Sequence, residues 1–357
     1  MDYLSFIIWS ADPDIFVIPG LNHPVRWYGL LFAMGFILSQ QVMFYVFKKD
    51  GRDEKEVETL TMYMVVAVIV GARLGHCLFY DPVMYLTNPH KILFIWEGGL
   101  ASHGGAIGIL TALYLFARKM KGMTYFWMLD RIVIVVCLTG AMIRTGNFMN
   151  SEMIGIQTDF PLGVVYTNNL ESGLSYVYRK QIEDIDFTSN DDLESTPEGL
   201  KPISAIITFQ RGASTSIDAN QVKMIYQRDE YYSNFVAVDQ PITYSTFQEG
   251  NKTYGKLDFY GIPRHPAQLY EAFYCLMLFF LLAHLWYWHR HKLNEGVIFG
   301  IFLVTLWSLR FFDEYLKLSQ EPWEDGLPLN MGQILSIPLV IAGIVILIKK
   351  SGKKQTA

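Results

Sequence analysis

The chain has 357 residues, of which 51% are hydrophobic, 15% aromatic and only 18% charged. Soluble domains carry about a quarter charged residues. The low charge and a mean hydropathy of +0.22 therefore argue against a soluble protein and indicate a membrane protein with one sizeable polar portion. The net charge of -5 identifies no partner, because the acidic residues concentrate between positions 171 and 260. We expect no nucleic-acid partner.

The cysteines indicate buried thiols rather than a disulfide framework. Cys77, Cys137 and Cys275 each lie inside an apolar run, whereas a framework would place them in polar loops at regular spacing. The first 25 residues carry three aspartates and three prolines, with no basic region before an apolar core. We therefore expect no removable signal peptide.

Apolar stretches long enough to cross a bilayer recur along the chain. A spanning helix needs about 20 mostly apolar residues. Seven stretches meet this requirement, at 27–47, 59–80, 99–117, 125–147, 267–288, 296–316 and 330–348. The stretch 82–96 is too short and too interrupted by proline to span, and its aromatic residues predict an interfacial helix. The fold class predicted is an all-α polytopic membrane protein with seven transmembrane helices.

Basic residues predict the orientation of these spans, because cytoplasmic loops carry an excess of Lys and Arg. Basic clusters follow the first, third, fifth and seventh spans, at 48–55, 118–121, 290–292 and 349–354. These loops alternate, so all four fall on one side of the membrane. The N-terminus is then outside and the C-terminus cytoplasmic.

Residues 156–262 differ in kind from the spans. Runs such as "ISAIITF" and "FVAVDQPITYSTF", broken by clusters of Asn, Gly, Asp and Pro, predict short strands. The stretch "EDIDFTSNDDLESTPEG" is typical of a mobile acidic loop. We predict a first membrane part at 1–155, a small β-containing extracytoplasmic head domain at 156–262, and a second membrane part with a basic tail at 263–357.

Polar residues gather in the outer halves of the spans, whereas the cytoplasmic halves hold almost no ionisable group apart from Asp130. The outer group comprises Arg26, Tyr28, Arg73, His76, His103, Arg144, Asn147, Glu152, His265, Gln268, Tyr270, Glu271, Arg310 and Glu314. Each alone admits a structural explanation, such as a helix ion pair or a snorkelling arginine. Nearby glycines allow a similar reading, close helix packing: Gly71, Gly75, Gly98, Gly99, Gly104 and Gly105.

Together, the outer residues favour a functional site, because a charge at mid-bilayer costs about 2.5–3.5 kcal/mol on insertion scales. The four arginines of the group face only three glutamates, which leaves spare positive charge. An arginine fork matches a phosphate, and the phosphate at this depth is a lipid headgroup. The residues therefore predict an outer-leaflet cavity that binds an anionic phospholipid.

The stretch "IRTGNFMNSEMIG" (143–155) closes the fourth span. If it stays helical, Arg144, Asn147, Ser151 and Gly155 share one face and Glu152 lies at its margin. Its last twelve residues resemble the signature Arg-x-Gly-Asn-Phe-x-Asn-x-Glu-x-x-Gly of prolipoprotein diacylglyceryl transferases. Further matches follow in order along most of the chain: "RWYG", "GARLG", "GGLASHGG", Asp130, "RHPAQLYE" and "RFFDE".

The resemblance implies a multi-pass enzyme of the bacterial inner membrane whose active site faces the periplasm. The family transfers the diacylglyceryl group of phosphatidylglycerol to the lipobox cysteine of a prolipoprotein signal peptide. It forms a thioether and releases glycerol phosphate, the first step of lipoprotein maturation, with no metal and no organic cofactor. The residues suit this chemistry, since a thiol of pKa about 8.5 needs a base or a positive field and arginine stabilises a departing phosphate.

Carried over by position, the resemblance assigns roles to individual residues. Arg144 and Arg310 would hold the phosphate, and His103 is the candidate general base toward the thiol, or else positions the headgroup. The residues expected to bind substrate or shape the site are Tyr28, Arg73, Gly104, Asn147, Glu152, Gly155, His265, Tyr270, Glu271 and Glu314.

Several positions depart from the family pattern. Arg26 stands where many members have His, and Leu306 where many have Tyr, so we expect no base chemistry at the first and no hydroxyl contact at the second. Lys317 replaces a frequent Arg, and Ala267 the usual Ser or Thr. The region 163–260 is longer than the typical head domain.

Two functions of other classes are alternatives. A phospholipid or anion transporter would also want an arginine-lined cavity, but it needs polar groups along the full path or repeat symmetry. Here the inner halves are apolar and the chain shows no internal repeat. A catalytically inactive lipid-binding scaffold would leave His103 and the glutamates unexplained.

Overall fold

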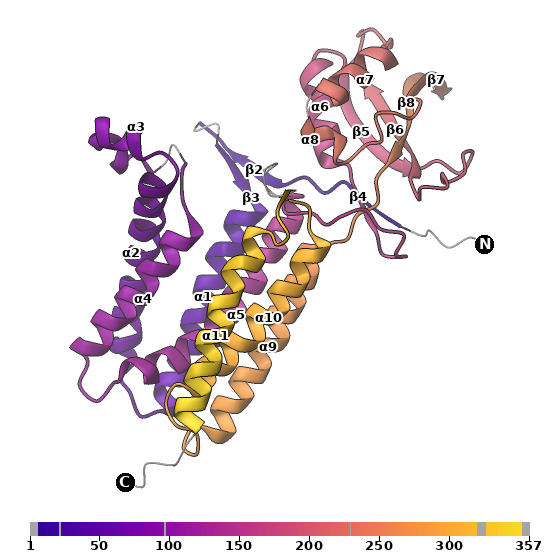
Figure 1. The fold of residues 1–357 in the computed structure, drawn as a ribbon. Coiled ribbons are helices and arrows are strands. Elements are labelled where there is room, and N and C mark those ends of the chain that lie inside the picture. Colours follow the sequence, from indigo (N-terminus) through magenta and orange to yellow (C-terminus); the bar gives the residue numbers. More distant parts are fainter. Residues whose placement is uncertain (1–5, 21–22, 96–97, 229, 320–325, 352–357) are drawn as a thin grey trace. The chain divides into compact units, whose positions relative to one another are not determined.

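The structure is a computed structural model that describes residues 6–20, 23–95, 98–228, 230–319 and 326–351. Long helices and short strands succeed one another along the chain (Figure 1). The chain forms two compact units. The first comprises Met1–Phe32, Ile143–Phe273 and Arg310–Gln333, and the second comprises Ala33–Met142, Tyr274–Leu309 and Ile334–Ala357.

Within the described residues, a long helix occupies the place of each predicted span. These helices are α1 (Trp27–Lys49), α2 (Glu54–Phe79), α4 (Ser102–Lys119), α5 (Tyr125–Met149), α9 (Ala267–His289), α10 (Val297–Asp313) and α11 (Met331–Ser351). Five of the described helices are long and apolar enough to cross a membrane: α1, α2, α5, α9 and α11. Helices α4 and α10 are shorter, with 18 and 17 residues. The chain is therefore a helical membrane protein.

The stretch predicted as one interfacial helix forms two short helices instead. These are α3 (Pro82–Thr87) and a 3-10 helix, η1 (Pro89–Leu93). Proline lacks an N–H and disfavours helix at the residue before it, so Pro89 separates them at Asn88. Val83, Leu86 and Leu93 leave most of their side chains exposed on this segment.

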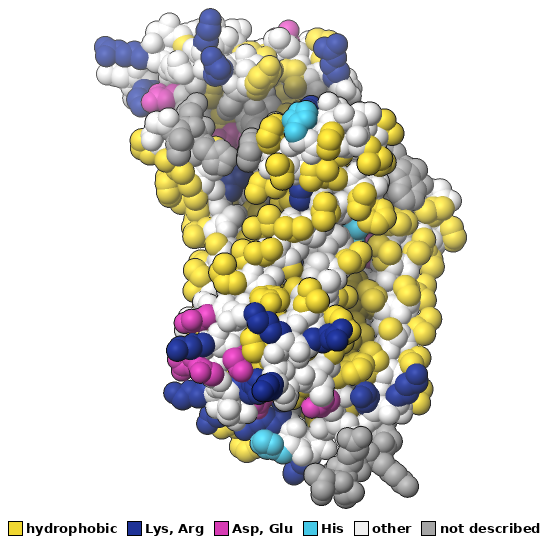
Figure 2. All heavy atoms as spheres, turned by 90° about the vertical axis from the view of Figure 1, so that its left-hand side faces the viewer, with side chains coloured by type: hydrophobic (Ala, Val, Ile, Leu, Met, Phe, Trp, Pro, Cys, Tyr) yellow, Lys and Arg dark blue, Asp and Glu magenta, His cyan; other side chains and the backbone are white. Residues whose placement is uncertain are grey.

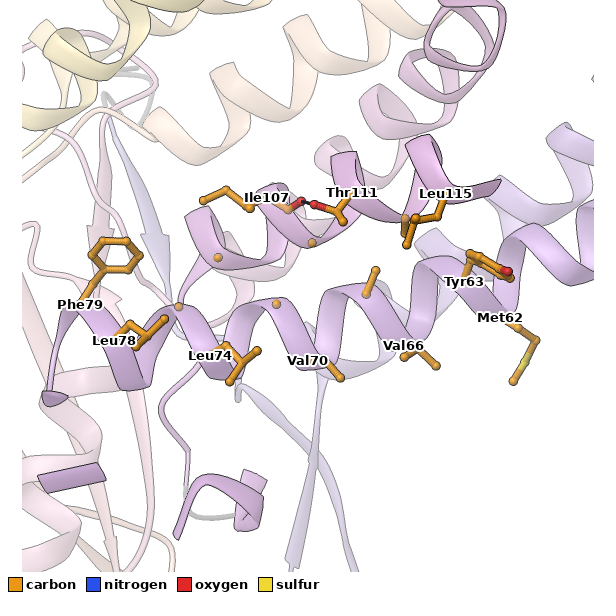
Figure 3. Close-up of a pocket in the computed structure, with 16 residues that line it drawn as sticks. Met62, Tyr63, Val66, Val70, Leu74, Leu78, Phe79, Ile107, Thr111 and Leu115 are labelled. Atoms are coloured by element: carbon orange, nitrogen blue, oxygen red, sulfur yellow. Dashed lines mark hydrogen bonds between the residues drawn. The ribbon is translucent and has the colours of Figure 1, made fainter. Parts of the chain in front are cut away.

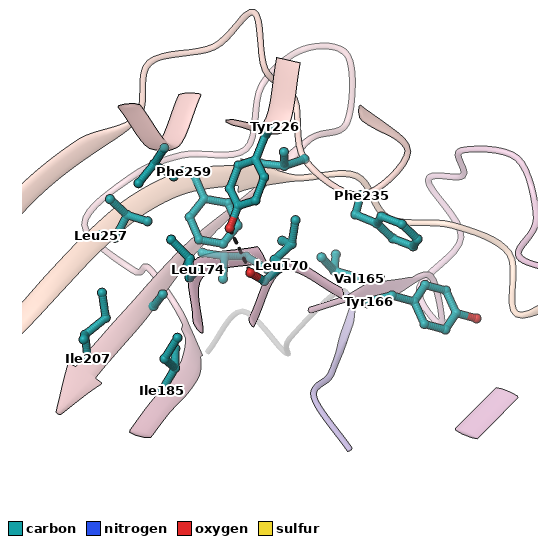
Figure 4. Close-up of a cluster of buried hydrophobic side chains, with 14 of the residues drawn as sticks. Val165, Tyr166, Leu170, Leu174, Ile185, Ile207, Tyr226, Phe235, Leu257 and Phe259 are labelled. Atoms are coloured by element: carbon teal, nitrogen blue, oxygen red, sulfur yellow. Dashed lines mark hydrogen bonds between the residues drawn. The ribbon is translucent and has the colours of Figure 1, made fainter. Parts of the chain in front are cut away.

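The first unit contains an antiparallel sheet of four strands in the order β5-β6-β8-β7: β5 (Ile182–Ser189), β6 (Lys201–Phe209), β7 (Thr243–Glu249) and β8 (Lys252–Gly261). Helices α6 (Asn168–Val177), α7 (Ala219–Arg228) and α8 (Glu230–Ser233) lie between strands in sequence. Alternate residues of β8, among them Leu257 and Phe259, point inward. They join a core that includes Ile207 and Tyr226 (Figure 4).

Strand β5 corrects one prediction. The acidic stretch from 183 was expected to be a mobile loop, but residues up to Ser189 pair with β6. Ile185 and Phe187 alternate with Asp184 and Asp186, so the apolar side chains reach the core while the carboxylates stay outside. The other small pairs are parallel β1 (Ile7–Trp9) with β4 (Val164–Tyr166), and antiparallel β2 (Asp14–Ile18) with β3 (His23–Arg26).

In the second unit, glycines bring α2 and α4 into contact. A Cβ on Gly75 would lie 2.6 Å from the Gly104 Cα, and one on Gly71 would lie 2.5 Å from the Gly104 carbonyl oxygen. Only glycine fits at these positions, as in other close helix crossings within membranes. Close helix packing is thereby confirmed as an explanation for Gly71, Gly75 and Gly104, but not for Gly105, whose Cβ would make only ordinary contact. Cys77, Cys137 and Cys275 are buried and take part in no disulfide, as predicted.

Candidate functional site

A glutamate joins three cations from different segments of the first unit. Glu271, in the first turns of α9, places Oε1 at 2.9 Å from Arg144 Nε and 2.6 Å from Arg310 Nη1. Its other oxygen, Oε2, accepts a hydrogen bond from Lys317 Nζ at 2.9 Å. Arg144 lies near the end of α5 and Arg310 near the end of α10. One carboxylate therefore fixes the ends of three helices relative to one another.

Lys317 also holds two further carboxylates. Its Nζ lies 3.1 Å from Asp313 Oδ2 and 3.2 Å from Glu314 Oε1, and its side chain is only 3% exposed. Arg310 Nη2 reaches the same Glu314 oxygen at 3.2 Å. Three cations thus meet three carboxylates. The spare positive charge expected from the sequence is absent from this described cluster, because Asp313 adds a carboxylate and Arg26 pairs with Asp14 instead.

Arg26 lies apart from these contacts. Its Nε pairs with Asp14 Oδ1 at 3.0 Å across the β2–β3 hairpin, and more than half of its side chain is exposed. The sequence pattern predicted that all four outer arginines form one group. Arg26 instead stabilises a hairpin, and an exposed pair of this kind contributes about 0.2–1 kcal/mol.

Helix α5 ends at Met149, so the helical face proposed for 143–155 is wrong beyond that residue. Ser151 and Met153 have φ values of 54° and 56°, in the left-handed region that a right-handed helix cannot use. The buried hydroxyl of Ser151 donates a hydrogen bond to Asn168 Oδ1 at 2.7 Å, which holds the turn. Strained backbone of this kind clusters at functional sites.

The turn nevertheless brings together three residues of the signature. Arg144 Nη1 donates to Asn147 Oδ1 at 3.1 Å, and Asn147 Nδ2 donates to Glu152 Oε2 at 3.2 Å. Asn147 therefore connects the guanidinium to the carboxylate. Among the described residues, no partner bonds Arg144 Nη2, so this donor remains available to a ligand.

Gly155 lies in a short backbone ladder of three segments. Its N–H donates to the His265 carbonyl at 3.0 Å, and the N–H of Ile156 donates to the Leu316 carbonyl at 2.9 Å. A Cβ at position 155 would lie 2.5 Å from the His265 carbonyl oxygen and 2.6 Å from that of Leu316. Gly155, predicted to bind substrate, is therefore glycine for a structural reason. The ladder also positions the segment that leads into α9 and the segment that contains Lys317.

Tyr28 lies beside the signature helix. A Cβ on Gly146 would lie 3.0 Å from the Tyr28 Cα, so this glycine lets the start of α1 approach α5 closely. Gly146 lies between the predicted site residues Arg144 and Asn147 on α5. The predicted lipid-pocket tyrosine is thus adjacent to two other predicted site residues.

His265 and Tyr270 contact each other just before and inside α9. His265 Nδ1 lies 3.1 Å from the Tyr270 hydroxyl, and the His265 ring stacks on Phe160 with ring centroids 6.5 Å apart. Burial lowers the pKa of His265 below its ordinary value. Burial therefore favours the neutral ring, whose tautomer determines whether it donates to or accepts from the hydroxyl.

In the second unit, Arg73 forms a clamp on backbone. Its Nε, Nη1 and Nη2 donate to five carbonyl oxygens, those of Lys91, Ile92, Phe94, Gly98 and Gly99. The residue is 3% exposed, and its guanidinium lies 5.0 Å from the Tyr85 ring centroid. Arg73 was predicted to bind substrate, but all three of these nitrogen atoms donate to the segment between α2 and α4. The residue therefore holds that segment in place.

His103 also belongs to the second unit, in the first turn of α4, where it is exposed. Its ring meets Phe79 edge-on at 5.2 Å and stacks on Tyr80 at 5.8 Å. Phe79 lines one end of an apolar groove of about 700 Å³ between α2 and α4 (Figure 3). Side chains at every fourth position of α2, from Met62 to Leu78, line the groove along its length. His103 thus lies at the end of a groove suited to hydrocarbon.

Three residues had no predicted role in the site: two members of the Glu271 cluster, and Gln268, which supports the turn after α5. Lys317 was noted only as a departure from Arg, and Asp313 was not singled out, although their i,i+4 spacing is a usable signal. Gln268 was grouped with the outer polar residues without a role. Its Nε2 donates to the Glu152 carbonyl oxygen, a contact across more than a hundred residues that no local pattern reveals.

Together with the apolar helices, these contacts define a membrane-embedded protein with a buried guanidinium–carboxylate site at its helix ends. The chain belongs to the prolipoprotein diacylglyceryl transferase family, whose sequence model matches residues 13–349. The family resemblance read from the signature is thereby confirmed.

Three similar proteins carry the name phosphatidylglycerol–prolipoprotein diacylglyceryl transferase. The protein from Porphyromonas gingivalis is 34% identical over 352 residues, covering 97% of this chain and 95% of the relative. The one from Tolumonas auensis is 34% identical and covers 98% and 99%. The one from Chloroherpeton thalassium is 31% identical and covers 99% and 98%. The similarity therefore extends over almost the whole of each protein.

Proposed function

We propose that the chain transfers the diacylglyceryl group of phosphatidylglycerol to the lipobox cysteine of prolipoproteins. The thiolate sulfur attacks the glyceryl carbon that bears the phosphate, the carbon–oxygen bond breaks, and glycerol phosphate leaves with the electron pair. The family assignment and the names of the similar proteins support this reaction. The Arg144–Glu271–Arg310 arrangement carries the proposal, because it sets two guanidiniums on one carboxylate oxygen.

The site works as a phosphate clamp in this proposal. The substrate phosphate binds the open Nη2 of Arg144 and competes with Glu271 for both guanidiniums, since phosphate and carboxylate suit the same fork. Lys317 keeps Glu271 compensated as the arginines turn to the ligand. The charge that develops on the leaving phosphate is then stabilised by preorganised cations.

His103 deprotonates the thiol in the same proposal. Its exposed ring at the end of the apolar groove suits a residue that meets a cysteine beside lipid. In the first unit, the arginines are oriented by Tyr28, Asn147, Glu152, His265, Tyr270 and Glu314, and Gly155 supports them through the backbone ladder. In the second unit, Arg73 and Gly104 support the segment that carries His103 through their backbone contacts.

We further propose seven spans, with α4 and α10 completing the five longer helices. The N-terminus and the sheet-containing insert at 156–262 lie in the periplasm, and the C-terminus lies in the cytoplasm of a bacterial inner membrane. The basic residues that end α1, α4 and α11 support this orientation. The membrane parts are 1–155 and 263–357.

An in vitro assay of diacylglyceryl transfer tests the proposed function directly. Purified full-length protein, phosphatidylglycerol and a lipobox peptide should yield a peptide whose mass increases by one diacylglyceryl group.

Two variants test the roles of individual residues. Arg144→Lys keeps the charge but loses the planar fork of the guanidinium, so it should slow transfer by roughly 100-fold, whereas the exposed Arg179→Lys should not. His103→Gln should slow transfer by a similar factor, with the exposed His284→Gln as its control. Failure of the unaltered protein to modify the peptide would contradict the reaction, and full activity of His103→Gln would contradict only the base.

A further inference from the structure

A polar pocket lies in the second unit, among residues that the transfer reaction does not use. It has a volume of about 370 Å³. It lies where α1 and α9 end and α5 and α10 begin. Figure 2 shows that charged side chains gather at this end of the helices, beyond a broad hydrophobic band. From the sequence, Asp130 stood out as an ionisable group here, and Lys49 and Arg290 belonged to the basic clusters that orient the spans. That they share a pocket could not be predicted, because local patterns do not reveal partners on different helices.

Two arginines of the pocket share one carboxylate. Arg131 Nε lies 2.9 Å from Asp50 Oδ2, and Arg290 Nε lies 3.1 Å from Asp50 Oδ1. Each guanidinium also lies over an indole ring, with distances to the centroid of 4.1 Å for Trp127 and 5.0 Å for Trp286. The carboxylate and the rings fix both guanidinium planes, so little side-chain entropy remains to be lost on binding a ligand.

The donors of these arginines are only partly used. Nη1 of Arg131 donates to the Trp127 carbonyl, and Nη1 of Arg290 donates to the Tyr287 carbonyl. Neither Nη2 bonds any residue within the described ranges. Lys49, which is exposed, adds a third cation to the lining.

The carboxylates of the pocket are already engaged. Both oxygens of Asp50 pair with arginine. Asp130 accepts hydrogen bonds from the backbone N–H groups of Gly296 at 2.7 Å and Phe299 at 2.8 Å, which cap the start of α10. Glu295 accepts one from the Thr124 hydroxyl. The uncommitted groups of the arginines and of Lys49 are therefore hydrogen-bond donors carrying positive charge.

We propose that this pocket binds a phosphate group, held by Arg131, Arg290 and Lys49. The two Nη2 groups supply charge-assisted hydrogen bonds from fixed planes, the arrangement that suits phosphate oxygens. The phosphate comes either from a phospholipid headgroup at this face of the membrane or from a free anion. Its site is separate in residues from the Arg144–Glu271–Arg310 cluster, so it anchors or stabilises the protein without entering the reaction.

Thermal unfolding of the full-length protein in a non-ionic detergent tests the proposal, because a ligand of the folded state raises the midpoint in a concentration-dependent way. The ligands are inorganic phosphate at constant ionic strength, and short-chain phosphatidylglycerol or phosphatidylethanolamine. Arg290→Gln and Lys49→Gln should each raise the half-saturating concentration of the effective ligand about tenfold, the loss expected for one charge-assisted hydrogen bond. Arg118→Gln, at an exposed position in the last turn of α4, is the control.

A response to inorganic phosphate alone supports the site with a free anion as ligand, and a response only to a phospholipid supports a headgroup. The substrate site is unaltered in these variants, so its response to phosphatidylglycerol is common to all of them. Equal responses in Lys49→Gln, Arg118→Gln and the unaltered protein would overturn the proposal. Lys49 is exposed, so this comparison stands even if Arg290→Gln fails to fold.

Discussion

Lys317 Nζ lies 2.9 Å from Glu271 Oε2, on a carboxylate whose other oxygen is already shared by two arginines. The lysine therefore balances the negative charge of Glu271 through Oε2, the oxygen that the arginines do not contact. Removing one partner of a buried ion pair costs more than the pair contributes, because the remaining charge is left desolvated. Lys317 is for this reason a positioning residue for the arginine site.

Replacing Lys317 by Met should destabilise the protein by about 3–5 kcal/mol, because buried carboxylates lose a cation. Lys317→Arg, which restores the charge, should recover most of the stability. Thermal unfolding measures the first effect. The KM for phosphatidylglycerol, measured on folded protein, separates positioning from stability. Lys180→Met, at an exposed site, is the control. A Met variant as stable as the unaltered protein would show that the lysine is not needed for charge balance.

Gly155→Ala should disrupt the backbone ladder. The new Cβ would meet two carbonyl oxygens at 2.5 and 2.6 Å, and backbone atoms cannot turn away as a flexible side chain can. We expect a loss of about 2 kcal/mol or more in the free energy of unfolding and a matching fall in transfer activity. A Cβ on Gly326, in the same unit, would meet no atom of the described residues within 4 Å, so Gly326→Ala should be nearly neutral. Equal stability of the two variants would argue against the ladder.

The close packing of α2 against α4 can be tested with alanine at two neighbouring glycines, Gly104 and Gly105. A Cβ on Gly104 would press on the backbone of Gly71 and Gly75, whereas one on Gly105 would make ordinary contact with Ala72 Cβ at 3.7 Å. Gly104→Ala should therefore lower the unfolding midpoint by several degrees, while Gly105→Ala should leave it nearly unchanged. If both behave alike, position 104 is glycine for a reason other than packing, such as contact with substrate.

The sequence predicted the long helices well because apolar length is a local property. The signature also located Arg144, Asn147 and Glu152 correctly as a group, although the helical face assumed for them ends at Met149. Contacts between distant segments could not be predicted in this way. The ladder joins residues 154–156, 265 and 316–318, and the Asp50 pocket joins the ends of different helices. Strand β5 was missed because its acidic residues hid the alternation of Ile185 and Phe187.

The unfolding of the sheet-containing unit should depend on pH through Glu171 of α6. Burial, followed by the charges of Asp12, Asp184 and Asp186, raises the pKa of this carboxyl from 4.5 to about 7. Between these two pH values the folded state binds more protons than the unfolded state, so stability falls as the pH rises and then levels off above about 7.

Glu171→Gln removes this titration. The stability of Glu171→Gln relative to the unaltered protein should therefore increase between pH 4.5 and 7, and stay constant above that. We expect an increase of the order of 1 kcal/mol, because solvent screens a half-buried side chain. Unfolding midpoints at pH 5 and pH 8 measure it, with the exposed Glu194→Gln as a control of equal charge change. A difference that stays flat, or that runs in the opposite direction, would mean that Glu171 is ionised throughout this range in the folded protein.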